Sequence, residues 1–128
     1  MSKNCRLDVD FYDYCLTHHN EVLRELDFVV ANSLPVPYFG DLAAYLASPV
    51  RVLTAALNPS NREFTEPRFE VDMGLRGPVA LESQLSAYFK VNPYEPWFKA
   101  FEPVLNGLEA SYGGTMANGP HVSTALHV

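Results

Sequence analysis

The chain has 128 residues and a formal net charge of −6, with nine Lys and Arg residues against fifteen Asp and Glu residues. This length suits one domain with a single core, and contents of 48% hydrophobic and 12% aromatic residues are typical of a soluble globular protein. The acidic balance argues against tight binding to duplex DNA, because proteins that bind duplexes usually carry a basic surface.

Targeting and membrane signals are not found in the sequence. No charge-free apolar run approaches the roughly 18 residues of a membrane span, and the first residues lead directly into acidic ones rather than into the apolar core of a signal peptide. We therefore expect a cytoplasmic protein with no membrane association. Cys5 and Cys15 lack metal-ligand or redox spacing and are expected to be reduced structural thiols. We expect no metal and no cofactor.

The first predicted element is a helix over residues 8–32, started by Asp8 or Asp10 as a cap. His18 is predicted to pack on its apolar face and His19 to be solvated. Adjacent histidines on a helix point about 100° apart and are poorly placed to share a metal. The apolar face is predicted from residues at three- and four-residue spacing, namely Phe11, Cys15, His18, Val22, Leu26 and Val29.

The segment over residues 33–41 should interrupt the helical part of the chain. Pro35 and Pro37, with one residue between them, favour extended backbone there. Two interpretations stay open for the aromatic residues that follow, Tyr38 and Phe39. They fold back onto the core as a lid, or they form one wall of a ligand pocket. A short helix over residues 41–48 is predicted next.

Residues 50–57 are predicted to form a central strand. Arg51 is their one charged residue, which suits a strand covered on both faces, as parallel strands are in α/β proteins. Asn58 and Pro59 then open a polar turn at its carboxyl end, where open α/β sheets place ligands. Because proline restricts the preceding residue to extended backbone, Asn58 should present its side chain, although a turn asparagine bonding its own loop is an alternative. A surface connection over residues 65–77 follows.

Two helices are predicted in the second half of the chain. Residues 79–90 carry apolar side chains at helical spacing, and Pro96 suits the first position of the next helix. Pro103 should kink or split that helix because it removes one backbone hydrogen bond, and Gly113 with Gly114 should end it.

The predicted fold is one α/β domain over residues 1–128, a partial three-layer α/β/α arrangement around a parallel sheet. Residues 123–128 should form a second core strand, parallel to residues 50–56 and joined to them through the helices. Two strands are too few for an independently stable sheet. We therefore expect either self-association through an uncovered strand that ends at Val128, or a chain that is the N-terminal part of a larger domain.

At its centre the chain resembles the uracil-DNA glycosylase superfamily. Leu57, Asn58, Pro59 and Ser60 after an apolar strand are similar to the first motif of that superfamily, in which an Asn-Pro-Gly turn supplies a water-positioning asparagine. The wider pattern resembles uncharacterised bacterial proteins related to the superfamily and covers most of residues 35–128. It comprises the segment 35–41, the turn 58–64, Tyr88, Phe89, Asn92, Pro93, Tyr94, Trp97, Phe98, Ser111 and Tyr112.

The resemblance implies a mechanism and a set of site residues. A base is flipped into a pocket, stacked on an aromatic ring and read along its edge, while Asn58 orients water toward the sugar C1′. Asn58 is the implied catalytic residue. The implied substrate-binding residues are Ser60, Asn61, Phe64, Tyr38 and Phe39, with Phe64 as the candidate stacking ring.

Two features depart from the superfamily pattern. Ser60 replaces a glycine and adds a Cβ where backbone would approach the ligand. Neither His121 nor His127 matches the histidine-bearing loop that forms the second motif. Two function classes therefore stay open. One is an enzyme, or an incomplete part of one, that hydrolyses the N-glycosidic bond of a base in nucleic acid, such as single-stranded DNA, or in a free nucleoside. The other is a noncatalytic module that binds a nucleotide or a protein partner, including a second copy.

Overall fold

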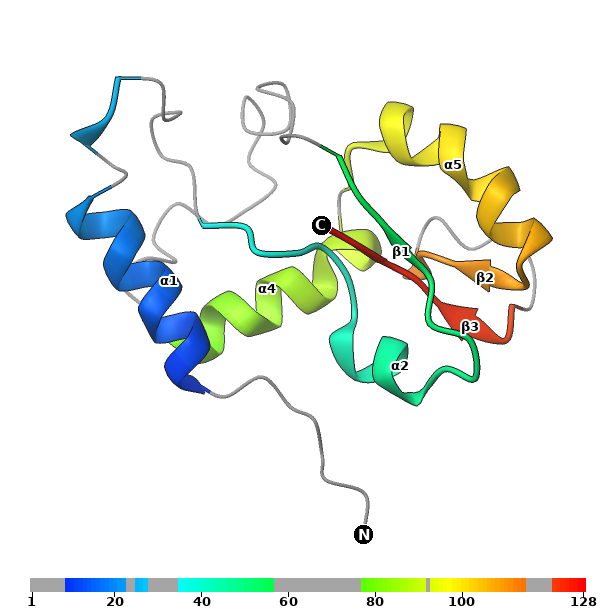
Figure 1. The fold of residues 1–128 in the computed structure, drawn as a ribbon, viewed down its shortest axis with the longest axis horizontal. Helices are drawn as coiled ribbons and strands as arrows, with labels where there is room; N and C mark the ends of the chain where they lie inside the picture. The colour runs from blue at the N-terminus through cyan, green and yellow to red at the C-terminus, as the bar shows by residue number, and fades with distance from the viewer. Residues whose placement is uncertain (1–8, 23–24, 28–34, 57–76, 92, 115–120) are drawn as a thin grey trace, which may run out of the picture.

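The computed structural model describes residues 9–22, 25–27, 35–56, 77–91, 93–114 and 121–128. The described part of the chain is mixed α/β, with four helices and two small parallel sheets of two strands each (Figure 1). The elements in order are α1 (Val9–Glu21), α2 (Leu42–Ala47), β1 (Leu53–Thr54), α4 (Pro78–Val91), α5 (Glu95–Gly107), β2 (Ala110–Ser111), β3 (Ser123–Thr124) and β4 (Leu126–His127).

The strand pairing confirms the predicted parallel relation between the middle of the chain and its last residues. β1 pairs in parallel with β4, with Leu53 opposite Leu126 and Thr54 opposite His127. β2 pairs in parallel with β3. The prediction did not include β2, and the predicted strand over residues 123–128 is divided into β3 and β4. Helices α4 and α5 lie between β1 and β4 in the sequence, as expected for a parallel pair.

The segment over residues 121–128 lies between neighbours on both of its edges. On one edge, Ala125 N donates to Ser111 O of β2 at 2.8 Å, and His127 N donates to Phe39 O at 3.1 Å. On the other edge, Leu126 N donates to Val52 O at 3.2 Å, and Val128 N donates to Thr54 O at 2.9 Å. The expectation that the strand ending at Val128 leaves its backbone uncovered is therefore wrong.

The two strands of the first pair differ in how they are covered. Leu126 and His127 are both buried, and because successive side chains point to opposite faces, β4 is covered on both faces. Leu53 on β1 is 49% exposed. Over the described residues 50–56, the prediction of a strand covered on both faces is wrong, since β1 comprises only Leu53 and Thr54 and the side chains of Val50 and Leu53 are exposed.

Helix α1 corrects two predictions. It ends at Glu21 rather than near residue 32, and its buried side consists of Tyr12, Leu16 and His19. His19 is buried and His18 is exposed, which is the reverse of the prediction. The buried face is rotated by one residue because Tyr12 packs inward, where its hydroxyl hydrogen-bonds the hydroxyl of Tyr38.

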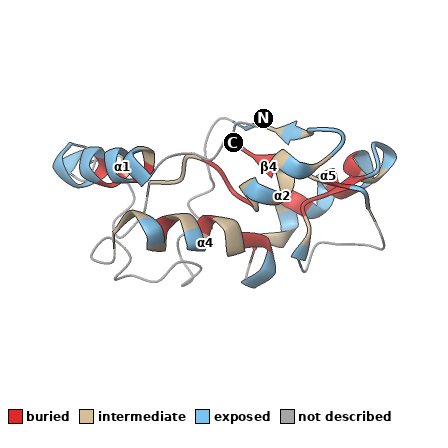
Figure 2. Cartoon of the chain, turned by 90° about the horizontal axis from the view of Figure 1, so that it is seen from below, coloured by how far each residue is buried: buried red, intermediate tan, exposed pale blue. Residues whose placement is uncertain are grey.

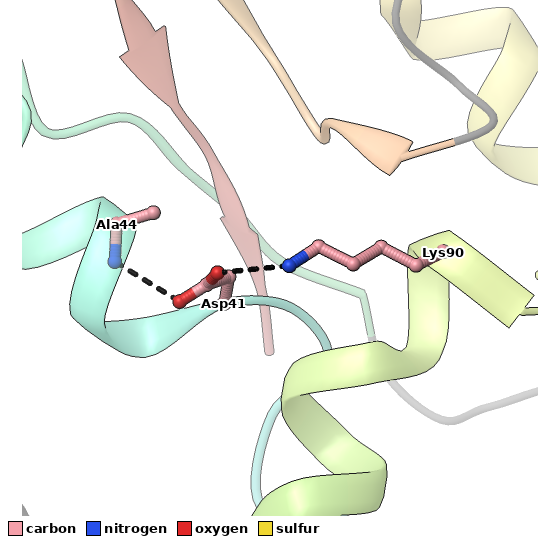
Figure 3. A network of polar contacts seen from close by, with 3 residues as sticks. All are labelled: Asp41, Ala44 and Lys90. Atoms are coloured by element: carbon pink, nitrogen blue, oxygen red, sulfur yellow. Dashed lines mark hydrogen bonds and ion pairs between the residues drawn. The ribbon is translucent and has the colours of Figure 1, made fainter.

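Helix α2 confirms the short helix predicted over residues 41–48. Asp41 caps its start by accepting a hydrogen bond from Ala44 N at 3.0 Å. The other carboxylate oxygen of Asp41 accepts from Nζ of Lys90 at 3.3 Å, as Figure 3 shows. One carboxylate thus both starts α2 and connects it to the end of α4.

Helix α4 confirms the helix predicted over residues 79–90, and α5 departs from its prediction. Pro103 lies inside α5 without splitting it. The helix ends at Gly107, six residues before Gly113. Gly113 and Gly114 instead follow β2, and both have positive φ.

Aromatic residues dominate the core. Figure 2 shows buried residues along α4, in the segment that leads to α2, and at β4. The rings of Phe39, Tyr88, Phe89, Phe98 and Tyr112 contact one another with centroids 4.2–6.1 Å apart. The core therefore joins α4, α5 and the residues beside β4 through one continuous set of ring contacts.

Candidate functional site

The predicted catalytic residue lies outside the described part of the chain. The same holds for Ser60, Asn61 and Phe64 and for residues 65–76 of the predicted connection, so the expected pocket around Asn58 is not described. The described chain reaches Ala56, whose N–H donates to Val128 O at 3.0 Å. Ala56 therefore lies at the carboxyl ends of β1 and β4, which is the edge where α/β sheets bind ligands.

Tyr38 and Phe39 are both buried in the core, which agrees with their interpretation as a lid. Phe39 pairs with His127 in an antiparallel bridge, with N···O distances of 2.8 and 3.1 Å. Burial raises the pKa of the Tyr38 hydroxyl, and the hydrogen bond with Tyr12 raises it further. Tyr38 thus faces α1, and only Phe39 lies beside the ends of the strands.

His127 occupies an aromatic enclosure at these strand ends. Its ring centroid lies 4.5 Å from Trp97, 5.2 Å from Phe98 and 6.0 Å from Phe39. The side chain is 7% exposed, and burial lowers its pKa, against a hydrogen bond with Thr54 that raises it. The imidazole is therefore neutral at pH 7, since burial disfavours its charged form.

Three polar side chains form a hydrogen-bonded chain across the strands. Thr54 Oγ1 lies 3.0 Å from Nδ1 of His127 and 2.6 Å from the Tyr112 hydroxyl. Burial raises the pKa of Tyr112 to about 12, so its hydroxyl is protonated and can donate to Thr54. Thr54 Oγ1 also donates to Leu126 O at 3.3 Å. The direction of its bond with Nδ1 of His127 depends on the tautomer of the imidazole.

A second polar cluster connects α5 to β2. Glu102 is buried, and its Oε1 accepts from Tyr112 N at 3.2 Å and from Ser111 Oγ at 3.5 Å. With its amide nitrogen turned toward these acceptors, Asn106 lies 3.3 Å from Oε2 of Glu102 and 3.1 Å from Nε2 of His121. Burial raises the pKa of Glu102, while the hydrogen bonds from Tyr112 and Ser111 and the charge of His121 lower it. The Glu102 carboxyl group therefore positions Tyr112 through the hydrogen bond that it accepts from the Tyr112 backbone N–H.

Glu102 should make the stability of the protein depend on pH. Because burial raises the pKa of Glu102 in the folded state, the folded protein holds this proton more tightly than the unfolded chain. The resulting stabilisation is complete below the ordinary value of 4.5 and is lost as the pH rises through the folded-state pKa. Glu102→Gln keeps an acceptor and cannot ionise. Its stability relative to the wild type should therefore increase from pH 4 to pH 8.

Urea unfolding at pH 4, 6 and 8 measures this change. Glu109→Gln is the matched control, since Glu109 is exposed and its replacement should leave the pH dependence unchanged. A free energy of unfolding of Glu102→Gln that stays constant or decreases relative to the wild type toward pH 8 would show that the buried carboxyl group is as stable ionised as protonated.

The described residues hold no group of three or more His, Cys, Asp or Glu side chains that could bind a metal ion. Within the same part of the chain, no helix has the length and apolar character needed to cross a membrane. Cys15 is half-buried on α1, and burial raises the pKa of its thiol, which lowers its reactivity.

Comparisons of the chain with protein-family models, with curated proteins and with solved structures give no match. The function must therefore be inferred from the residues and their geometry. Sequence reasoning did not place Thr54, Trp97 and Tyr112 around His127, although Trp97 and Tyr112 belong to the pattern that carries the resemblance. The alignment of Thr54 with His127 in the parallel pair places both side chains on the same face, and the sequence alone does not give that alignment.

Proposed function

We propose that this chain is a uracil-DNA glycosylase-like α/β domain that hydrolyses an N-glycosidic bond with a water oriented by Asn58. We also propose that the fold is a partial three-layer α/β/α arrangement around the parallel strands. One observation carries it. β1 and β4 are parallel, and Ala56, two residues before Asn58, is hydrogen-bonded at their carboxyl ends. The described chain thus approaches Asn58 at the edge where α/β sheets present catalytic residues, which supports the proposal.

The chemistry follows from the amide group. Asn58 has two N–H donors and a carbonyl acceptor, so it can hold a water in one orientation. An amide is too weak a base to remove a proton, and its contribution is positioning. Most of the barrier is then lowered by departure of the base as a stabilised anion. Ser60 and Asn61 in the same turn are proposed to contact the base edge, with Phe64 stacking on its face.

The aromatic surroundings of His127 support a flat ligand at this end of the sheet. Trp97 is half-buried, and its ring contacts that of His127 with centroids 4.5 Å apart. Stacking of a base on an aromatic ring contributes about 1–3 kcal/mol in proteins that bind single strands. The net charge of −6 favours a small ligand such as a nucleoside over duplex DNA.

Base release tests the catalytic assignment. The wild-type chain should release uracil from a uracil-containing single-stranded oligonucleotide or from deoxyuridine. Asn58→Ala should lower that rate by about 10²–10³-fold, the range observed when one positioned hydrogen-bonding group is removed from an active site. Asn20→Ala makes the same chemical change on an exposed face of α1 and should leave the rate unchanged. An Asn58→Ala variant that releases base at the wild-type rate would remove Asn58 from the mechanism.

A noncatalytic module is the second candidate, and one observation favours it. His127 is enclosed by three rings, and its Nδ1 is bonded to Thr54, so it is poorly placed to serve as the histidine of the missing second motif. This candidate predicts that uracil-containing strands quench the fluorescence of Trp97, the one tryptophan of the chain, without any release of base.

A further inference from the structure

Within the described part of the chain, β1 forms hydrogen bonds along one edge only. Val52 O accepts a hydrogen bond from Leu126 N, and Thr54 O accepts one from Val128 N. Ala56 N donates to Val128 O. In a parallel ladder, alternate residues direct their backbone groups to the same side. The N–H and C=O groups of residues 51, 53 and 55 therefore point away from β4, and no described residue pairs with them.

The side chains along this open edge do not protect it. Val50 is 53% exposed and Leu53 is 49% exposed. The one charged residue is Arg51, whose Nη2 donates to Leu46 O at 3.3 Å, so its guanidinium group is turned back toward α2. Edge strands in monomeric proteins are usually protected by charged side chains, bulges or a covering loop. This edge has exposed apolar side chains and unpaired backbone groups at the same place.

We infer that β1 pairs in an antiparallel manner with β1 of a second copy of the chain. Unpaired N–H and C=O groups require an extended backbone as their partner, and a two-fold axis brings the same edge from both copies together. Among the described residues, β1 is an edge strand, whereas the segment over residues 121–128 has neighbours on both of its edges. Pairing through β1 therefore extends the sheet across the two-fold axis, with the order β4, β1, β1, β4 at its centre.

The charged residues of the two copies do not prevent an antiparallel pairing centred on Leu53. With the two-fold axis at Leu53, Leu53 packs opposite Leu53 of the partner subunit, and Arg51 lies opposite Ala55 of the partner subunit. The two arginines are then four residues apart along the strands, which is about 14 Å. That exceeds the Debye length of about 8 Å at physiological salt, so their repulsion is screened.

Sedimentation equilibrium between 5 and 200 μM measures the association. The wild type should dimerise, and Leu53→Lys should weaken the dimer at least about tenfold, because it removes the Leu53 contact and places two like charges directly opposite each other. Val79→Lys is the matched control, since Val79 is exposed on α4 and its replacement should leave the dimer intact. Circular dichroism confirms that each variant is folded.

Amide hydrogen exchange of the wild type tests the pairing without any substitution. The amides of Leu53 and Ala55 should exchange slowly at 200 μM and rapidly at 5 μM, while the amide of Ala56 should be protected at both concentrations. A wild type that stays monomeric at 200 μM would overturn the inference. The inference would also be overturned if Val104→Lys dissociated the dimer and Leu53→Lys did not. Val104 belongs to the exposed apolar side of α5, so this result would place the interface on α5 instead of β1.

Discussion

Replacing Phe98 with alanine is expected to lower the free energy of unfolding by about 3–5 kcal/mol. The Phe98 ring is 1% exposed and lies edge-on to Phe89 at 4.9 Å, to Tyr112 at 5.1 Å and to His127 at 5.2 Å. Removing it leaves a cavity that rigid neighbouring rings cannot fill, and it also removes the edge-to-face contacts. The loss should therefore fall at the upper end for a core substitution.

Urea denaturation followed by circular dichroism measures this loss. Phe101→Ala is the control, because Phe101 lies one turn further along α5, stacks on Trp97 at 4.4 Å and is 37% exposed. Its replacement should cost about 1 kcal/mol. Equal losses for the two variants would contradict a core in which Phe98 joins α5 to α4 and β4.

Gly114→Ala is expected to destabilise the fold by about 2–5 kcal/mol, the sum of backbone strain and overpacking. Gly114 has φ of +57°, in the left-handed region that costs other residues about 1–2 kcal/mol. A Cβ there would also overlap the Phe89 carbonyl oxygen and lie 2.7 Å from Lys90 N. These are backbone atoms of α4 that cannot rotate away, so overpacking adds about 1–3 kcal/mol.

Two other glycines separate these contributions. Gly113 has φ of +81°, and an added Cβ would meet no other atom within 4 Å, so Gly113→Ala should show only the backbone strain, about 1–2 kcal/mol. Gly107 lies at the end of α5 with open space around it, and Gly107→Ala should not destabilise the protein. Thermal unfolding of the three variants should follow this order. Similar losses at Gly113 and Gly114 would show that α4 does not approach Gly114 closely.

The helices of the second half could be predicted because their spacing is unambiguous. Leu81, Leu85 and Tyr88 fit one face of a helix and no other arrangement, and all three are buried in α4. In α1, apolar residues lie on two neighbouring faces, so the spacing does not decide which face is buried. The buried face is selected by the contact between Tyr12 and Tyr38, which lie 26 positions apart in the sequence. The spacing of residues within the helix carries no information about that contact.

The strands and the site depend even more on distant residues. β2 is two residues long, too short for an alternating pattern. The polar chain from Tyr112 through Thr54 to His127 depends on the register of β1 against β4, which is fixed by packing between segments more than 70 residues apart. Sequence reasoning could predict a strand in the middle of the chain that pairs in parallel with its last residues, but could not identify the side chains that the pairing brings together.

The place at which a nucleobase binds tests the proposed function most directly. In a ¹H–¹⁵N NMR titration with deoxyuridine and with a uracil-containing single strand, the signals of the Asn58 side-chain amide, the Trp97 indole and the backbone of Ala56 and His127 should shift together. Signals from α1 should stay in place. Shifts confined to α1, or no shift at the Asn58 amide at saturating ligand, would contradict a base site at the carboxyl ends of β1 and β4.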